Sequence, residues 1–240
     1  MSFVVGILLA WYVVFLFSAT CHEAAHAWAA RLGGDSTAYE GGQVSLDPFP
    51  HIRREPVGMI VVPLLSFVLI GYSYGWQNAW MIGWASAPYN PLWAARHPRR
   101  HALMSLAGPM ANFVIAGTAL LLLKLMLGAG VLQVPAQGLA YTNLVEAARG
   151  NYGSTLGAVA MVLGLLLILN LLLGLFNLLP IPPLDGGSVA EGLGPPPVQR
   201  IYATMREQPL FGMIGLVVAW QIFPHLWFPV VSVALHVLYS

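Results

Sequence analysis

The chain has 240 residues, of which 58% are apolar and only 8% charged, and its formal net charge at pH 7 is +1. Soluble domains contain about 25% charged residues, so this composition excludes an ordinary water-soluble protein, and the lack of a basic block argues against nucleic acid as a partner. Several apolar runs reach the roughly 18 residues that a helix needs to cross a lipid bilayer. The sequence predicts an all-α polytopic membrane protein with about five or six transmembrane or re-entrant helices.

The first apolar run covers residues 3–31 and ends at Gly33 and Gly34, which favour the end of a helix. The residues that follow are more polar. Within them, residues 36–39 and 43–46 flank Glu40, Gly41 and Gly42, a pattern typical of two short strands joined by a turn. We expect a small membrane-associated β-hairpin at residues 36–46, with an interfacial loop as the alternative.

The next apolar run, residues 57–74, leads into a stretch at 76–93 that is rich in tryptophan and interrupted by proline. Such a stretch is a poor continuous helix, and residues 57–96 either cross the membrane twice or re-enter it. Residues 101–127 and 154–179 are the clearest spans after the first. The last run, residues 209–240, contains Pro224 and Pro229, so it forms either one kinked span or a short pair of helices.

Basic residues beside the spans predict the orientation, because Arg and Lys are retained on the cytoplasmic side of membranes. If the first helix runs inward and residues 57–96 enter the membrane and return, most arginines lie on the cytoplasmic side. These are Arg31, Arg53, Arg54, Arg96, Arg99, Arg100, Arg200 and Arg206. Arg149 then lies outside, and Lys124 lies near the outer end of its helix.

His22, Glu23 and His26 form an H-E-x-x-H pattern inside the first apolar run. In an α-helix, residues four apart rise by about 6 Å and project from one face, so both imidazoles can bind one metal ion. Catalytic zinc sites use such ligands, with three protein groups and a water molecule. Glu23 is placed to take a proton from that water and pass it to a leaving amine. Alternatively, these polar residues mark a helix end wetted by solvent.

A third zinc ligand must come from elsewhere, as a carboxylate, histidine or cysteine at membrane depth. Asp185 follows the fourth apolar run in a stretch rich in proline and glycine, where the backbone can approach closely. It is the main candidate, although an aspartate there also fits the N-cap of a helix beginning near Ser188. Cys21 points about 100° away from His22 around the helix, which favours packing over ligation.

Three segments together resemble the site-2 protease family, peptidase family M50, of intramembrane zinc metalloproteases. They are His22-Glu23-Ala24-Ala25-His26, residues 107–112 with Asn112, and residues 177–187 with Leu184-Asp185-Gly186. The resemblance implies that His22, His26 and Asp185 bind Zn²⁺, that Glu23 is the general base, and that Asn177 polarises the scissile carbonyl or holds the substrate. Asn112 is expected to bond across to the first or fourth helix, as a structural or substrate-positioning residue.

The resemblance also implies a minimal bacterial member of the family without a PDZ or CBS domain. Its protease core would occupy residues 1–190, and residues 191–240 would add a loop and one or two transmembrane helices. The implied activity is hydrolysis of a peptide bond in or near a transmembrane segment of a membrane-protein substrate. The site would lie near the cytoplasmic side of a bacterial cell membrane.

An extended substrate needs partners for its backbone groups in a dry site, and the hairpin and residues 87–91 are candidates for edge pairing. Two other functions stay open at this point. One is an inactive zinc-binding membrane protein, and the other is a metal transporter in which the same ligands line a path. The sequence sets no oligomeric state.

Overall fold

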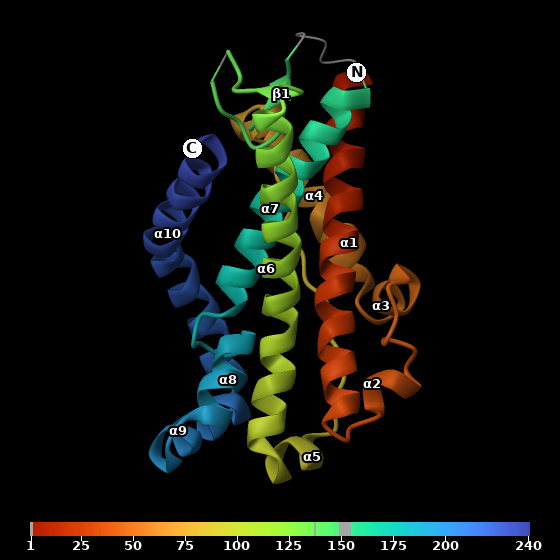
Figure 1. The fold of residues 1–240 in the computed structure, drawn as a ribbon. Coiled ribbons are helices and arrows are strands. Elements are labelled where there is room, and N and C mark those ends of the chain that lie inside the picture. Colours follow the sequence, from red (N-terminus) through yellow and green to blue (C-terminus); the bar gives the residue numbers. More distant parts are fainter. Residues whose placement is uncertain (1, 137, 149–154) are drawn as a thin grey trace.

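The computed structural model describes residues 2–136, 138–148 and 155–240. Three long helices form its centre: α1 (Ser2–Leu32), α6 (Pro98–Gly128) and α7 (Thr155–Asn177). Figure 1 shows α1 and α6 running side by side along the length of the molecule, and α7 packs against both. The most extensive helix contacts join α6 to α7, α1 and α8 (Asp185–Leu193), so α6 is the element on which the others assemble.

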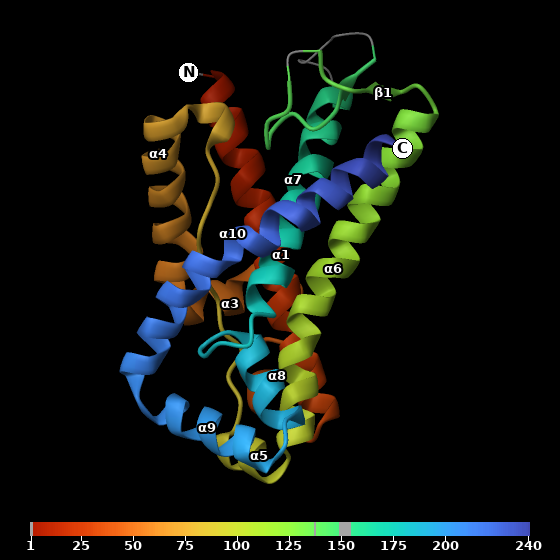
Figure 2. The same ribbon diagram turned by 90° about the vertical axis from the view of Figure 1, so that its left-hand side faces the viewer.

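Five described helical segments are long and apolar enough to cross a membrane, as expected of an all-α polytopic protein. They are Phe3–Leu32, Val57–Tyr74, Pro98–Gly128, Thr155–Asn177 and Leu210–Tyr239. The last lies within α10 (Pro209–Tyr239), a single helix that contains Pro224 and Pro229. The C-terminal run therefore forms one helix rather than a pair, and in Figure 2 this helix crosses α7 diagonally.

The chain between α1 and α6 runs out as a helix and returns in an extended conformation. A π-helical turn, η1 (Val57–Val61), continues into α4 (Val62–Tyr74). A 3-10 turn, η2 (Trp76–Asn78), then precedes the extended residues 79–90 and α5 (Pro91–Arg96). The irregular return accounts for the poor helical pattern of residues 76–93.

The extended return, residues 79–90, runs alongside α1. Met81 belongs to a cluster with Trp11 and Phe15, in the first half of α1. Tyr89 packs in a cluster with Ala30, near its end. Residues 79–90 therefore pass the part of α1 that carries the H-E-x-x-H pattern.

The predicted hairpin at residues 36–46 is wrong in its position. That segment forms a short helix, α2 (Thr37–Glu40), which is followed by a turn and by α3 (Pro48–Arg54). Asp35 explains the difference, because its Oδ1 accepts hydrogen bonds from the amide and the hydroxyl of Thr37 and so favours a first helical turn. The small antiparallel strand pair lies elsewhere, where β1 (Leu132–Gln133) pairs with β2 (Glu146–Ala147).

Apolar side chains are buried on two sides of α7. One cluster joins α7 to α6 and α10, and Leu123, Leu167 and Trp227 are among its members. A second joins α7 to α1 and the chain around α4, with Trp11 and Leu169 among its members. Close packing of this kind is what holds helices together in a bilayer. It fixes α7 relative to both α1 and α6.

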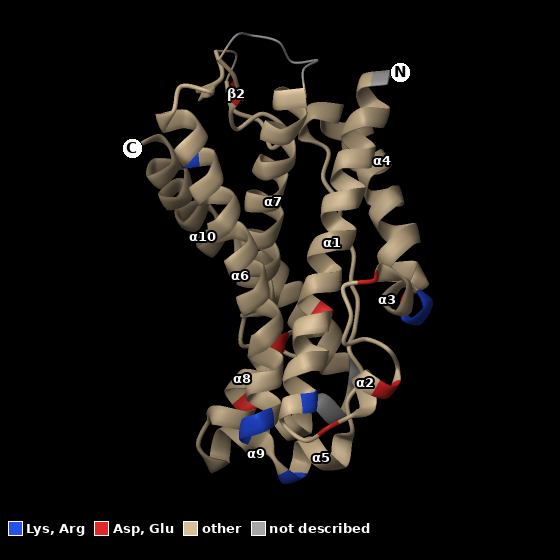
Figure 3. Cartoon of the chain, turned by 45° about the vertical axis from the view of Figure 1, so that its right-hand side comes forward, with Lys and Arg blue, Asp and Glu red and all other residues tan. Residues whose placement is uncertain are grey.

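Charged side chains gather at one end of the bundle. The helices α8 and α9 (Pro196–Glu207) lie at this end together with α2 and α5, as Figures 1 and 2 show. In Figure 3 the blue Lys and Arg segments lie mainly at this end and on α3. Arg31 stands in the last turn of α1, so the H-E-x-x-H pattern lies toward this basic end.

Candidate active site

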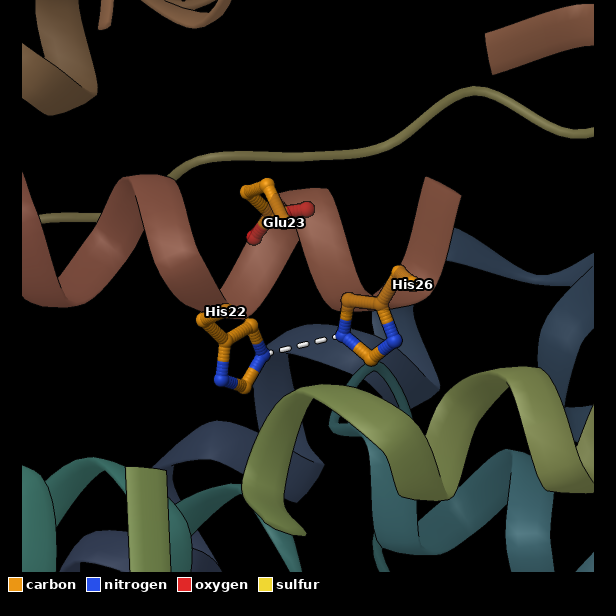
Figure 4. A group of neighbouring side chains, drawn as sticks. All are labelled: His22, Glu23 and His26. Carbon is orange, nitrogen blue, oxygen red and sulfur yellow. Dashed lines mark hydrogen bonds between the residues drawn. The ribbon is translucent and has the colours of Figure 1, made fainter. Parts of the chain in front are cut away.

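His22 and His26 lie in the second half of α1, on the side that faces α6. Figure 4 shows both imidazoles projecting from the same side of the helix. Their Nε2 atoms are 2.9 Å apart, and both residues are buried. The four-residue spacing thus brings two imidazole nitrogens to one point, as a helix requires.

Glu23 leaves α1 on a different side from the two histidines (Figure 4). Its carboxylate is nevertheless buried, and one of its oxygens lies within 4.8 Å of a nitrogen of each histidine. At that distance a carboxylate can share a water molecule with an ion that the histidines hold.

Asp185 reaches the two histidines from α8. Its Oδ2 lies 3.1 Å from Nε2 of His22 and 3.3 Å from Nε2 of His26. Asp185 is itself the first residue of α8, so it does not cap a helix that starts near Ser188.

Glycines let α8 come close enough for this contact. A Cβ at Gly192 would clash with the carbonyl oxygen of Pro98 on α6. One at Gly186 would clash with the carbonyl oxygens of Leu178 and Leu179. The backbone of α8 therefore packs directly against the start of α6 and the turn after α7, which sets Asp185 opposite α1.

The three donor atoms suit a zinc ion. Nε2 of His22, Nε2 of His26 and Oδ2 of Asp185 form a triangle with sides of 2.9, 3.1 and 3.3 Å. Ligand atoms at about 2.0–2.1 Å from a tetrahedral zinc are about 3.3–3.4 Å apart. Two imidazoles and one carboxylate also make up a common ligand set of catalytic zinc, which keeps a fourth position open.

Gly108 of α6 leaves the space beside this triangle free. A Cβ built at this position would clash with Nε2 of both His22 and His26. Any side chain here would therefore compete with a metal ion for the same nitrogens. Gly108 belongs to the site, a role that sequence reasoning did not assign to it.

The Nδ1 nitrogen of each histidine forms a hydrogen bond with a residue of α6. Nδ1 of His26 donates to the carbonyl oxygen of Met104 at 2.7 Å. A backbone carbonyl only accepts, so His26 carries a proton on Nδ1 and its Nε2 can face the site as a ligand. Nδ1 of His22 lies 2.5 Å from Oδ1 of Asn112, which links α6 to α1.

Behind Asn112 lies a residue that sequence reasoning did not single out. Oδ1 of Asn170, on α7, accepts a hydrogen bond from Nδ2 of Asn112 at 2.7 Å, and Nδ2 of Asn170 donates to Oγ of Ser18 at 2.9 Å. All three residues are completely buried. The available signal was the asparagine itself, because a polar side chain in the middle of an apolar span is costly unless it is bonded.

Asn177 lies at the end of α7 and turns back onto its own helix, where its Nδ2 donates to the carbonyl oxygen of Leu173 at 2.9 Å. The structure brings His22, Glu23, His26 and Asp185 together. Among the hydrogen bonds of the described residues, none joins Asn177 to that group. A role for Asn177 toward a substrate stays a prediction.

Comparison with known proteins identifies the family. The sequence profile of peptidase family M50 matches residues 10–218, a range that includes every predicted site residue and reaches into α10. No solved structure matches the chain significantly.

Two bacterial relatives match most of the chain. A Bacillus subtilis protein described as "Putative zinc metalloprotease YwhC" is 31% identical over 207 residues, which cover 86% of this chain and 77% of that protein. The "Putative zinc metalloprotease Rip2" of Mycolicibacterium smegmatis is 28% identical over 208 residues, covering 85% of this chain and 64% of that protein. The chain therefore belongs to peptidase family M50, in keeping with its resemblance to the site-2 proteases.

Proposed function

We propose that the chain is an intramembrane zinc endopeptidase that hydrolyses a peptide bond in or near a transmembrane segment of another membrane protein. The observation that carries this proposal is that Asp185 meets His22 and His26 beside the carboxylate of Glu23, and that these last three residues stand on α1, a helix long and apolar enough to cross a bilayer. Membership of peptidase family M50 and the names of the two relatives support both the zinc and the proteolysis.

The ligand set divides the chemistry between the metal and Glu23. Zinc bound by His22, His26 and Asp185 would supply a Lewis acid that polarises the scissile carbonyl and lowers the pKa of a water molecule to near 7. The carboxylate of Glu23 takes a proton from that water as the new C–O bond forms, and gives it to the amide nitrogen as the C–N bond breaks. Glu23 suits this task because it lies beside the ligand triangle and not within it.

The extended residues 79–90 offer a surface for the substrate. A substrate helix must unwind before cleavage, and its freed amides and carbonyls then need partners. Trp84 donates its amide to the carbonyl oxygen of Gly58, whereas the amides of residues 85–87 meet no backbone acceptor in the described part of the chain. A substrate strand would pair with residues 85–87 by edge addition, close to the 87–91 stretch expected from the sequence.

Basic residues support a site near the cytoplasmic side of a bacterial cell membrane. Arg31 lies in the last turn of α1 and Arg96 in the last turn of α5, at the end of the bundle toward which His26 lies. Positive side chains beside membrane spans are retained in the cytoplasm. Both relatives come from bacteria.

The experiment that tests the proposal replaces Glu23 with glutamine and measures zinc content and cleavage of a model membrane substrate in one preparation. Glutamine keeps the size of the side chain but accepts no proton. We expect unchanged zinc and a loss of cleavage on the order of 100-fold or more. Undiminished cleavage by Glu23→Gln would reject the mechanism, and zinc uptake into proteoliposomes without cleavage would point to a transporter instead.

A further inference from the structure

We propose that Asn170 is a positioning residue that decides, through Asn112, which ring nitrogen of His22 carries the proton, so that Nε2 keeps the lone pair with which it binds the metal. The inference rests on the proposed zinc site, because it concerns the orientation of one of its ligands. Hydrogen bonds that run from α7 through α6 to α1 carry it, and each has only one allowed direction.

This series of hydrogen bonds, the relay, begins at a backbone carbonyl, which can only accept. The carbonyl oxygen of Leu166 accepts a hydrogen bond from the Asn170 side chain at 2.9 Å, and a backbone carbonyl is only an acceptor. The atom of the Asn170 amide that faces it is therefore Nδ2. Oδ1 of Asn170 must then point the other way, toward Asn112, because a flipped amide would set two oxygens against each other.

The next hydrogen bond fixes the orientation of the Asn112 side-chain amide. Oδ1 of Asn170 requires a donor, so Asn112 presents its Nδ2 at 2.7 Å. The backbone carbonyl of Ser18, 3.5 Å from the same Nδ2, requires a donor as well. Oδ1 of Asn112 is thereby left to face His22.

At His22 the orientation of the Asn112 amide decides which ring nitrogen carries the proton. Oδ1 of Asn112 only accepts, and it lies 2.5 Å from Nδ1, so the neutral imidazole carries its proton on Nδ1. Nε2 keeps its lone pair, and Nε2 is the atom that faces His26 and Asp185. With Asn112 flipped, its NH₂ would face Nδ1, and the proton would move to Nε2 and block ligation.

Burial makes the relay effective. Ser18, Asn112 and Asn170 each have an exposed fraction of 0%, so solvent offers no alternative partner. His26 needs no such relay because its Nδ1 bonds directly to the backbone oxygen of Met104. The two ligands on α1 are thus oriented by different means.

Zinc affinity tests the relay, measured by competition with a fluorescent chelator on the purified full-length protein in detergent. Asn170→Leu removes the group that orients Asn112, and affinity should fall by roughly 10- to 100-fold, as for other outer-shell partners of metal ligands. Asn112→Asp alone sets a carboxylate oxygen against Oδ1 of Asn170, so it should also weaken binding.

The double variant Asn112→Asp/Asn170→Leu gives the sharpest result. It removes the clash, and the carboxylate at position 112 can only accept from Nδ1 of His22. Affinity should therefore recover above that of both single variants. A purely structural role predicts that the two losses combine instead, and that outcome, or wild-type affinity in Asn170→Leu, would overturn the relay.

Two variants of α1 serve as controls. Thr20→Val replaces a buried hydroxyl that has no hydrogen-bond partner among the described residues, so zinc affinity should not change. Ser18→Ala removes one acceptor of Asn170 but leaves the carbonyl of Leu166, so its effect should be smaller than that of Asn170→Leu.

The test distinguishes a change in zinc affinity from a failure to fold and from a loss of cleavage. If Asn170→Leu does not give a monodisperse protein, Asn170→Ala, which cannot overpack, takes its place in the same cycle with Asn112→Asp. Zinc binding requires no substrate. A protein that binds zinc but cleaves nothing would reject the endopeptidase and leave the relay standing, whereas equal zinc affinity in all variants would reject the relay alone.

Discussion

Oδ2 of Asp185 lies 3.1 Å from Nε2 of His22, although the two residues are 163 positions apart in the chain. The contact joins α8 to α1 and completes the triangle of candidate ligands. It depends on the close approach of α8 to α6 and not on a local preference of Asp185. Zinc binding should therefore be sensitive to this aspartate and insensitive to others.

Replacing Asp185 with alanine removes one of three proposed ligands, and zinc affinity should fall by more than the roughly 10- to 100-fold typical of an outer-shell partner. Zinc content after dialysis measures the loss. Asp47→Ala is the matched control: Asp47 accepts a hydrogen bond from the amide of Phe49 at the start of α3, so its loss costs about 1 kcal/mol of stability and no zinc. Equal zinc in the two variants would remove Asp185 from the ligand set.

Two glycines of α6 should respond in opposite ways to the same substitution. Gly108→Ala places a Cβ against Nε2 of His22 and His26 and should abolish zinc binding, whereas a Cβ at Gly117 meets nothing within 4 Å. Both changes raise helix propensity, so Gly117→Ala should leave zinc unchanged and keep or raise the unfolding temperature. Full zinc content in Gly108→Ala would contradict the assignment of Gly108 to the site.

The carboxyl of Asp35, which lies outside the membrane spans, should make the free energy of unfolding depend on pH. Burial raises the pKa of its carboxyl, but hydrogen bonds from Thr37 and from the amide of Asn90 outweigh burial and lower the pKa below its ordinary value. Folding thus favours the ionised form. Its contribution to the free energy of unfolding is complete above the ordinary pKa of about 4 and is lost as the pH falls through the lower folded value.

Asp35→Asn should therefore unfold at a lower temperature than the wild type at pH 7, and the difference should shrink below about pH 4. Thermal unfolding in detergent at pH 7 and at pH 3 measures it. A difference independent of pH would show that the charge of Asp35 has no part in the effect.

Ala85→Pro tests substrate pairing along the extended return. Proline removes the amide at position 85, which has no backbone acceptor in the described part of the chain. Cleavage should fall roughly fivefold to tenfold, as expected for one hydrogen bond of about 1 kcal/mol, while zinc content stays the same. Ala85→Gly keeps the amide and is the control. Equal cleavage by both variants would place the substrate elsewhere.

Local patterns predicted the spans and the paired histidines, because hydropathy and helical spacing act within one element. The hairpin at 36–46 was wrong because alternation and the glycine pair favoured strands, while Asp35 bonds to Thr37 and Arg31 stacks 3.5 Å over the ring of Tyr39. These contacts stabilise the helix α2 instead.

Residue chemistry made Asp185 the main candidate for the third ligand, the resemblance implied that role, and the structure places it beside both histidines. Asn170 and Gly108 could not be found in this way. Their roles depend on which face of α7 or α6 meets α1, and hydropathy does not tell the faces of a fully apolar helix apart. An asparagine within such a helix indicates a bonded partner but does not name it.

Residues 85–87 leave backbone amides without a backbone partner where the chain passes the histidines of α1. Hydrocarbon does not tolerate such groups. In the absence of a substrate these amides need water as their partner, so we expect water to reach this depth beside the return segment. The irregular backbone would thereby deliver the second reactant of hydrolysis to Glu23 from within an otherwise dry bundle.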